Sequence, residues 1–180
     1  PVDVSKYSVI YAGAQKNIAP AGVTIIIIRR DLLERSKESL PAMLNYRLMA
    51  EHESMYNTPP CWSIYMAGLT FRWLLDMGGI KEMEKINEAK AKILNDALDA
   101  SSYYIAPVSK ESRSIMNVTF TTPSPETDAL FVKEAAAAGL VNIKGHRLVG
   151  GMRASIYNAM PIEGVEKLVE FMAHFEAVHV

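Results

Sequence analysis

Cysteine is almost absent from this sequence, since Cys61 is the single thiol among 180 residues. One cysteine forms no internal disulfide and supplies no multi-thiolate metal site, so we expect no metal and a reducing compartment, the cytoplasm. The longest strongly apolar stretch, residues 23–28, has the length of a strand and not of a membrane span. The first residues have neither the basic-then-apolar order of a signal peptide nor the character of a transit peptide. We therefore expect no membrane partner.

An excess of charge of either sign is also missing. With 19 Lys and Arg against 20 Asp and Glu, the formal net charge is -1. Nonspecific nucleic-acid binding needs a basic surface, so nucleic acid is not an expected partner. The hydrophobic share of 49% and the charged share of 22% are typical of soluble globular proteins, and the length suffices for one or two domains.

Two short strands are expected near the start of the chain. Residues 8–11 and 23–28 have the character of buried strands of one sheet, and the second is a continuous β-branched run typical of a strand covered on both faces. A short helix over residues 31–36 and a long connection without a clean period over residues 40–57 should follow. Connections of this length usually have a functional or partner-contacting role.

Two helices of different character come next. Residues 60–77 are apolar nearly all round, which predicts a buried helix that ends at Gly78-Gly79. Residues 80–98 instead carry apolar side chains at three- and four-residue spacings with charges between them. This pattern predicts an amphipathic helix, supported by a pair between Glu88 and Lys92.

The rest of the chain predicts a small α+β unit of two strands and two helices. Alternation predicts strands over residues 115–121 and 152–157, and Ser124-Pro125 starts a helix that ends at Gly139. A terminal helix begins at Pro161, and its residues His174 and His179 are expected to be solvated. His52 receives no role.

Lys16 is the first candidate for chemistry, because it stands on a glycine-bounded turn between the two expected strands. Taken alone, a lysine in a polar turn is usually a solvated surface residue. A lysine that flanking strands hold in place, with a partly desolvated amine, can instead form a Schiff base with an aldehyde. The natural aldehyde partner is pyridoxal phosphate.

The segment Asn57-Thr58-Pro59-Pro60 precedes the apolar helix and permits two interpretations. Asn57 or Thr58 can cap that helix, with the first proline preorganising it. The same segment can also supply hydrogen-bond donors to a phosphate at the start of the helix. The two interpretations are compatible.

A basic cluster lies near the second strand of the α+β unit. Lys144, His146 and Arg147 stand on a glycine-bracketed turn, and Arg153 follows on the polar face of the strand. A substrate with an α-carboxylate at one end and a phosphate or second carboxylate at the other needs cations at both ends. The alternative is that these are ordinary solvent-facing residues.

Four separated motifs together resemble one enzyme family. They are AGAQKN followed by PAG, then NTPP, GHR and GGMRASIYNAMP, and they occur here in the family's order across essentially the whole chain. The sequence resembles the phosphoserine aminotransferase family of fold-type I pyridoxal-phosphate enzymes. The resemblance implies an α/β fold, the C-terminal part of such a transferase. Residues 1–78 would be the remainder of the large cofactor-binding domain, and residues 79–180 the linking helix and small α+β domain.

The resemblance also implies an activity. It is the transfer of an amino group between glutamate and 3-phosphohydroxypyruvate, with phosphoserine and 2-oxoglutarate as the other reactants, in serine biosynthesis and in bacteria also in pyridoxine biosynthesis. The resemblance implies a homodimer with shared active sites, and we expect this chain in the cytoplasm. Pyridoxal phosphate is the expected cofactor.

Roles for individual residues follow from the same resemblance. Lys16 would be the catalytic, cofactor-binding lysine, and Gln15 would contact the cofactor of its own subunit. Asn57 and Thr58 would reach the cofactor phosphate of the neighbouring subunit.

The substrate contacts lie in the second half of the chain. Arg153 would bind the substrate α-carboxylate. His146 and Arg147 would lie near the distal phosphate or carboxylate, in the site of either subunit.

Two departures from the family pattern leave alternatives open. Ala19 stands where the family usually has glycine, which alters the turn if a positive φ is needed there. The family's N-terminal half, which supplies the carboxylate and the aromatic ring around the cofactor, has no counterpart here, so these residues alone should be poor catalysts. The alternatives are a catalytically silent C-terminal piece and another fold-type I aminotransferase of small amino acids, indifferent to the substrate phosphate.

Overall fold

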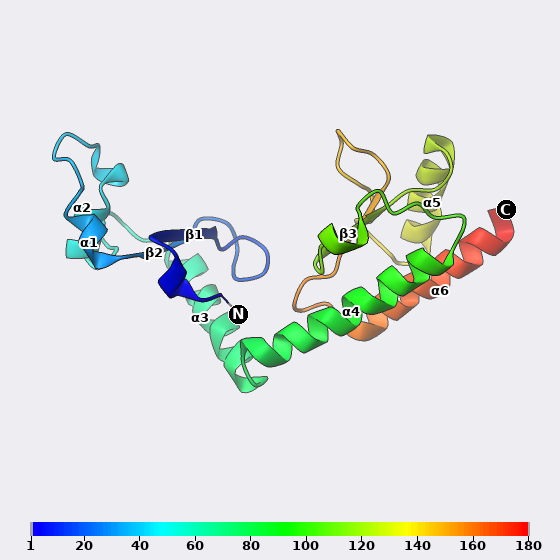
Figure 1. Cartoon of the computed structure of the whole chain (residues 1–180), viewed down its shortest axis with the longest axis horizontal. Helices are drawn as coiled ribbons and strands as arrows, with labels where there is room; N and C mark the ends of the chain where they lie inside the picture. Colours follow the sequence, from blue (N-terminus) through cyan, green and yellow to red (C-terminus); the bar gives the residue numbers. More distant parts are fainter. Residues whose placement is uncertain (1, 180) are drawn as a thin grey trace. The chain divides into compact units, whose positions relative to one another are not determined.

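A computed structural model describes residues 2–179 (Figure 1). The chain divides into two compact units, the first ending at Ile80 and the second beginning at Lys81. This division lies near the boundary expected after residue 78, and the assignment of the units to a large and a small domain stays a prediction. Within residues 2–179, no helix combines the length and the apolar character that crossing a bilayer requires.

The first unit contains two strands, three α-helices and two short 3-10 turns. These are the turn Val4–Lys6, β1 (Val9–Gly13), β2 (Thr24–Ile28), α1 (Arg30–Leu33), the turn Ala42–Leu44, α2 (Tyr46–Glu51) and α3 (Cys61–Asp76). The strands pair antiparallel, with Val9 opposite Ile28 and Gly13 opposite Thr24. The prediction that they share a sheet is confirmed.

The prediction that these two strands are buried is wrong. No residue of β1 or β2 is buried, and Tyr11 on β1 is 77% exposed. The isoleucine run of β2 indicates a strand covered on both faces, but a two-stranded sheet covers neither of its own faces. The described chain holds too little else around this sheet to bury it.

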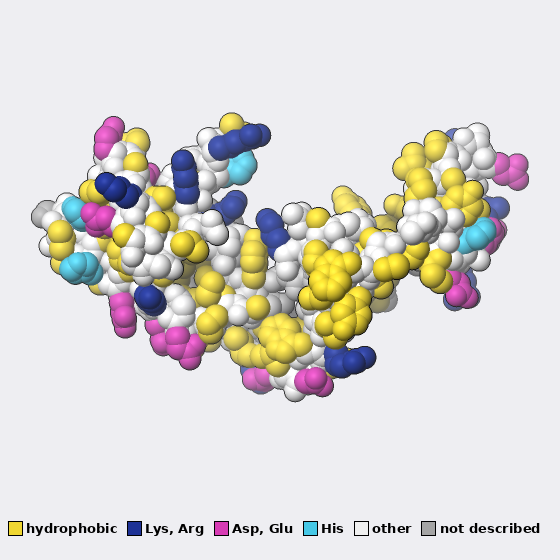
Figure 2. All heavy atoms as spheres, turned by 180° about the vertical axis from the view of Figure 1, so that it is seen from behind, with side chains coloured by type: hydrophobic (Ala, Val, Ile, Leu, Met, Phe, Trp, Pro, Cys, Tyr) yellow, Lys and Arg dark blue, Asp and Glu magenta, His cyan; other side chains and the backbone are white. Residues whose placement is uncertain are grey.

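The same correction applies to α3. The helix lies where it was predicted, but only Ser63 and Ala67 are buried along it. Trp62 is 65% exposed and Leu75 73% exposed. Figure 2 shows large hydrophobic side chains, ring systems among them, open on one face of the molecule. A helix that is apolar all round normally lies inside a protein, so α3 has the composition of a core helix without the cover of one.

The expected structureless connection over residues 40–57 is partly wrong, because it contains a 3-10 turn and α2. The Asn45 side chain caps α2 by accepting a hydrogen bond from the Leu48 N–H at 3.2 Å. Six residues are too few to display a helical period, which is why the pattern was not visible.

The second unit contains three α-helices, a short 3-10 turn and one strand pair. These are α4 (Ile80–Ala100), the turn Lys110–Ser112, β3 (Asn117–Phe120), α5 (Pro125–Ala137), β4 (Met152–Ser155) and α6 (Ile162–His179). The strands pair antiparallel, with Asn117 opposite Ser155 and Phe120 opposite Met152. All five predicted elements of this unit are confirmed.

The core of the second unit is built from the apolar positions that recur along its predicted helices and strands. Phe131 of α5 is fully buried and lies edge-on to Phe120 of β3 and Phe175 of α6, with ring centroids 5.6 Å and 5.0 Å apart. The Tyr104 hydroxyl donates to Met172 O at 2.8 Å, so the one polar atom of that ring is satisfied. The aromatic packing joins α5, α6 and the sheet into one body.

Two details of the second unit differ from expectation. Lys92 pairs with Asp96 at 2.6 Å instead of with Glu88, which is the same i, i+4 spacing in the opposite direction. His179 is not solvated, because its ring packs on Phe175 with centroids 4.3 Å apart and its side chain is only 24% exposed. His174 is exposed, as expected.

Candidate active site

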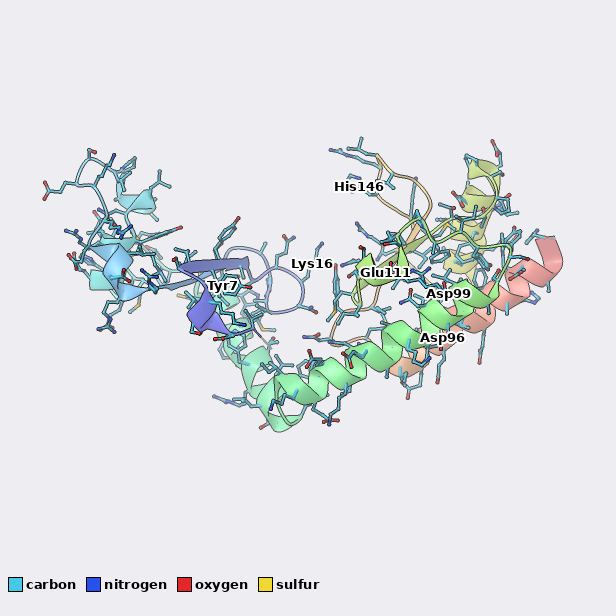
Figure 3. All side chains as sticks on the ribbon, in the orientation of Figure 1. Tyr7, Lys16, Asp96, Asp99, Glu111 and His146 are labelled. Atoms are coloured by element: carbon cyan, nitrogen blue, oxygen red, sulfur yellow. The ribbon has the colours of Figure 1, made fainter. Side chains whose placement is uncertain are left out.

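Lys16 lies on the tight turn that follows β1 (Figure 3). Its backbone has φ 89°, in the left-handed region that residues other than glycine rarely adopt. The Lys16 N–H donates to Ala19 O at 3.1 Å, and the Ala19 N–H donates to the carbonyl oxygen of a different residue, Ala14, at 2.8 Å. Backbone strain of this kind persists only where the surroundings hold it, and it is common at functional sites.

Small residues seat this turn on α3. Ala14, Ala19 and Ala67 are buried together and form the small core of the first unit. Ser63 of α3 donates its hydroxyl to Ala21 O at 2.9 Å, which ties the end of the turn to the same helix. The turn therefore rests on α3 through its backbone and its alanines.

The departure at Ala19 does not disturb this turn. The positive φ values belong to Lys16 and Gly22, and Ala19 is not among the residues that have one. Its methyl group is 93% removed from solvent and contributes to the small core. Alanine fits here because the left-handed position lies three residues earlier.

The side chains of Lys16 and Gln15 are exposed. The partial desolvation expected for the lysine is therefore wrong for this chain, because α3 covers the backbone of the turn and not its tip. Across residues 2–179, the Lys16 amine makes no hydrogen bond or ion pair. A primary amine on a rigid backbone is thus left available.

Asn57 and Thr58 do not cap α3. The N-cap residue is Pro60, and none of the side chains of residues 2–179 caps the start of the helix. Both side chains are exposed, and Asn57 Nδ2 donates only to Thr58 O, at 3.4 Å. The capping interpretation is wrong, and the start of α3 keeps amides that no side chain satisfies.

The basic turn of the second unit is shaped by close backbone contacts. The Gly145 N–H donates to Gly151 O at 2.7 Å. A Cβ on Gly145 would collide with Gly150 O and lie 2.7 Å from Gly151 O, so only glycine fits at this position. The glycine bracket seen in the sequence therefore has a steric cause.

His146 has a defined orientation within this turn (Figure 3). Its Nδ1 lies 3.2 Å from the Leu148 N–H and accepts from it, so a neutral ring carries its proton on Nε2. Its carbonyl accepts from the Val149 and Gly150 N–H groups at 2.9 and 2.8 Å. The exposed Nε2 can donate to an anion.

The turn and the start of α5 enclose a cavity of about 950 Å³. Its polar lining residues include Lys144, His146, Arg147, Thr122, Ser124 and Asp128. Sequence reasoning missed Thr122 and Asp128: the Asp128 carboxylate accepts from the Thr122 N–H at 2.7 Å and from its hydroxyl at 2.8 Å. An acidic residue in the first turn of a helix signals a cap, but no pattern signals the cavity wall.

Arg153 lies on β4 and does not line this cavity. Its N–H donates to Ile143 O at 2.7 Å, which fixes the backbone. The side chain is only partly exposed, and within the described residues its Nε is buried without a hydrogen-bond partner. An ordinary solvent-facing arginine would have neither property. A buried donor without an acceptor is rare and calls for an explanation.

The structure thus brings Lys144, His146 and Arg147 together around one cavity, and it places Arg153 elsewhere in the same unit. Lys16 and Gln15 lie on a separate turn of the first unit. Within residues 2–179, no three His, Cys, Asp or Glu side chains converge as metal ligands.

Comparison with known proteins supports the resemblance. Residues 1–168 match the family model of aminotransferase class-V. Phosphoserine aminotransferase 2, chloroplastic, of Arabidopsis thaliana is 58% identical over 180 residues, covering 99% of this chain and 43% of that protein.

Two solved structures share the fold. Phosphoserine aminotransferase from Bacillus circulans subsp. alkalophilus matches all of this chain and 50% of its own, with a TM-score of 0.97 and 45% identity. The pyridoxal-phosphate-bound enzyme of Trichomonas vaginalis matches 96% of this chain and 49% of its own, with a TM-score of 0.90 and 39% identity.

The chain therefore spans about half the length of these relatives. The predicted α/β fold of fold-type I aminotransferases is confirmed by the match to their structures. On the family model and the identities together, this chain belongs to the aminotransferase class-V family.

Proposed function

We propose that this chain supplies the cofactor lysine and the substrate-binding cations of a pyridoxal-phosphate-dependent phosphoserine aminotransferase. The reaction exchanges an amino group between glutamate and 3-phosphohydroxypyruvate. The observation that carries the proposal is the available Lys16 amine, on a strained turn, in a chain 58% identical along its length to a phosphoserine aminotransferase.

The residues of the first unit fit the cofactor. An aldehyde needs a primary amine, and Lys16 presents one from a backbone held by Ala14 and Ala19. Gln15 is exposed beside it and can contact the same cofactor. The start of α3 is uncapped and follows Asn57 and Thr58, so it offers hydrogen-bond donors to a phosphate. In the proposed dimer this phosphate belongs to the cofactor of the neighbouring subunit.

The division of chemical work follows from these positions. The bound cofactor supplies an electron sink for the bond at the substrate α-carbon. Lys16 would hold the cofactor through its amine, and the same amine would act as the base that takes the α-proton of the substrate. Its exposed position at the tip of the turn leaves that movement unhindered.

The cations of the second unit account for the substrate class. Arg153 donates to the α-carboxylate, because a guanidinium binds a carboxylate with two parallel hydrogen bonds and its Nε has no acceptor within the described chain. His146 and Arg147 take the distal group, which is a phosphate in phosphoserine and a carboxylate in glutamate. One histidine and arginine pair therefore serves both substrates.

The assembly and its location belong to the same proposal. Shared active sites require a homodimer, and exposed apolar side chains at the tip of the basic turn suit an interface: Leu148 is 83% exposed and Val149 75% exposed. We place the enzyme in the cytoplasm, in serine biosynthesis and, in bacteria, in pyridoxine biosynthesis. The near-neutral charge suits small-molecule substrates better than nucleic acid.

Amino transfer from glutamate to 3-phosphohydroxypyruvate tests the proposal. The chain is assayed alone and together with the half of the Bacillus circulans enzyme that it does not match. We expect little activity alone and clear activity in the mixture, lost in Lys16→Ala and kept in Lys37→Ala, a matched change at another exposed lysine of the first unit.

The alternatives give different results in this assay. A catalytically silent piece shows no activity in either preparation. An aminotransferase of small amino acids uses hydroxypyruvate as well as its phosphate ester, and His146→Ala then changes nothing. Activity that survives Lys16→Ala contradicts the proposed role of the lysine.

A further inference from the structure

Lys90 is fully buried, with an exposed fraction of 0%. It lies on the inward face of α4, where most helices of this kind place an aliphatic residue. No step of the proposed reaction uses it. A buried lysine has an unusual environment and calls for an explanation.

Three main-chain oxygens surround its ammonium group. Lys90 Nζ donates to Tyr157 O at 2.8 Å and to Met160 O at 3.0 Å, and Ile156 O lies at 3.5 Å. We call these three oxygens the carbonyl cage. An ammonium group has three donors, so the cage matches it in number.

The cage holds a cation without a carboxylate. Burial alone lowers the pKa of Lys90 from its ordinary range, and no neighbouring charge opposes this shift. A buried charge of this kind contributes less to stability than a well-packed apolar side chain would. The groups that Lys90 fixes therefore indicate what the buried charge does.

Asn87 binds the same segment from one turn earlier on α4. Its side chain is 3% exposed, and its Nδ2 donates to Asn158 Oδ1 at 2.8 Å. Residues 87 and 90 share a helix face because they are three apart. Figure 1 shows the connection between β4 and α6 reaching α4. Two polar side chains of α4 thus hold this one connection.

The connection begins where β4 ends, and β4 carries Arg153. The Ile156 N–H donates to Met116 O at 2.9 Å, and the Arg153 N–H donates to Ile143 O at 2.7 Å. A cation that fixes the carbonyls of residues 156 and 157 therefore fixes the end of this strand.

We propose that Lys90 is a positioning residue, the fixed cation of a carbonyl cage that holds the end of β4, and with it Arg153, in place. Its relevance to catalysis rests on the role proposed for Arg153. The placement itself depends only on contacts within the second unit.

Amide hydrogen exchange in the full chain tests the placement without cofactor or activity. We expect Lys90→Ala and Lys90→Met to speed exchange at the Arg153 and Ile156 amides about tenfold or more, with a smaller effect at Phe131 in the core of α5. Lys92→Ala is the matched control, because that lysine lies on the same helix with its side chain 73% exposed. It should change none of the three rates.

Adding small cations to Lys90→Ala shows whether the charged donor of Lys90 or only its volume holds the strand end. Ethylammonium can enter the space vacated in Lys90→Ala and donate to the cage, so it should restore slow exchange at Arg153 and Ile156. Tetramethylammonium has no donor and should not. If Lys90→Ala does not fold, Lys90→Met, which fills the space with an unbranched apolar chain, still gives the comparison.

Three results would overturn the proposal. In the first, the Arg153 and Ile156 amides of Lys90→Met exchange as slowly as in the parent chain. In the second, exchange at Phe131 speeds up as much as at Arg153 and Ile156. In the third, tetramethylammonium restores slow exchange as well as ethylammonium does. Each is readable whether or not Lys16 binds a cofactor, so failure here and failure of the proposed function are distinguishable.

Discussion

Arg153 has one buried atom that the contacts of the described residues leave without a partner. Its backbone is fixed by a hydrogen bond to Ile143 O, but its buried Nε has no acceptor within residues 2–179. Sequence reasoning weighed a carboxylate-binding arginine against a surface one, and alternation along the strand could not separate them. The difference lies in the burial of one atom, which depends on packing from elsewhere in the unit.

Replacing this arginine should separate binding from stability. We expect Arg153→Met to weaken 2-oxoglutarate binding about 10- to 100-fold, since a hydrogen-bonded charge pair is worth about 1.5–3 kcal/mol. Thermal stability should be unchanged or higher, because an unsatisfied buried donor is removed. Calorimetric titration and melting measure the two effects, with exposed Arg35→Met as the control. A large fall in melting temperature with unchanged binding would assign Arg153 to the fold.

The backbone conformation of Lys16 predicts that glycine is not less stable than alanine at this position, contrary to the usual order. Glycine in place of alanine normally lowers stability by about 0.4–1 kcal/mol through the unfolded state. At φ 89° an alanine is strained and glycine is not, so we expect Lys16→Gly to be at least as stable as Lys16→Ala. Urea unfolding of the two variants checks this. A clearly less stable glycine variant would mean that the turn does not hold this conformation.

Asp99 on α4 should contribute to the loss of folding stability at acid pH (Figure 3). The hydrogen bond from Arg113 at 2.8 Å, and then that from Lys110 at 2.9 Å, lower the pKa of this carboxyl below its ordinary 3.8. A lowered carboxyl pKa means stability that is present above pH 3.8 and lost as the pH falls through the folded value.

Asp99→Asn should therefore melt below the parent chain at pH 7. The gap should close as the pH falls below 3.8, where the parent carboxyl becomes protonated too. Asp96→Asn is the control, because that carboxylate is 63% exposed in a surface pair and should change little. A gap between Asp99→Asn and the parent that is independent of pH would refute the assigned cause.

At the scale of elements, the second unit follows its sequence closely. The stripe of α6 and the alternation of β3 and β4 predict both the elements and their buried faces, because the second unit supplies the apolar partners of each. The cap at Ser124 is also confirmed, with its hydroxyl accepting from the Thr127 N–H at 3.2 Å. Local patterns suffice where the described residues bury the face that they predict.

The exceptions have a common physical cause. The composition of α3 and of β2 predicts burial, but the described residues do not provide the surface that would bury them. Lys90 is the opposite case: a charge on an amphipathic helix predicts solvent, and carbonyls from residues 156–160 bury it. A partner distant in sequence, or outside the described chain, leaves no periodic signal.

The basic turn offers a test at this scale. A Cβ on Gly145 collides with backbone, so we expect Gly145→Ala to lower the unfolding free energy by about 2 kcal/mol or more and to displace His146 and Arg147. Gly150→Ala is the matched control: it has φ 82° but nothing within 4 Å of the added methyl, so about 1 kcal/mol is expected. Urea unfolding compares them. Equal losses would show that the close contact is not what requires glycine at residue 145.

At the scale of the whole molecule, the two units differ in how much they bury. The second has a continuous aromatic core, whereas the core of the first is three alanines with partly buried neighbours. Each unit nevertheless carries residues with a proposed role, Lys16 in the first and His146, Arg147 and Arg153 in the second. The chain spans about half the length of its relatives, so the proposed reaction requires surfaces beyond those described.

Borohydride reduction of the chain after incubation with pyridoxal phosphate, followed by peptide mass analysis, tests the central claim most directly. Reduction makes a lysine–aldehyde linkage permanent, and the mass identifies the lysine. We expect one cofactor-sized adduct, on the peptide containing Lys16, absent from Lys16→Ala and present in Lys37→Ala. Adducts spread over the exposed lysines, or none on Lys16, would contradict the assignment of this residue as the cofactor lysine.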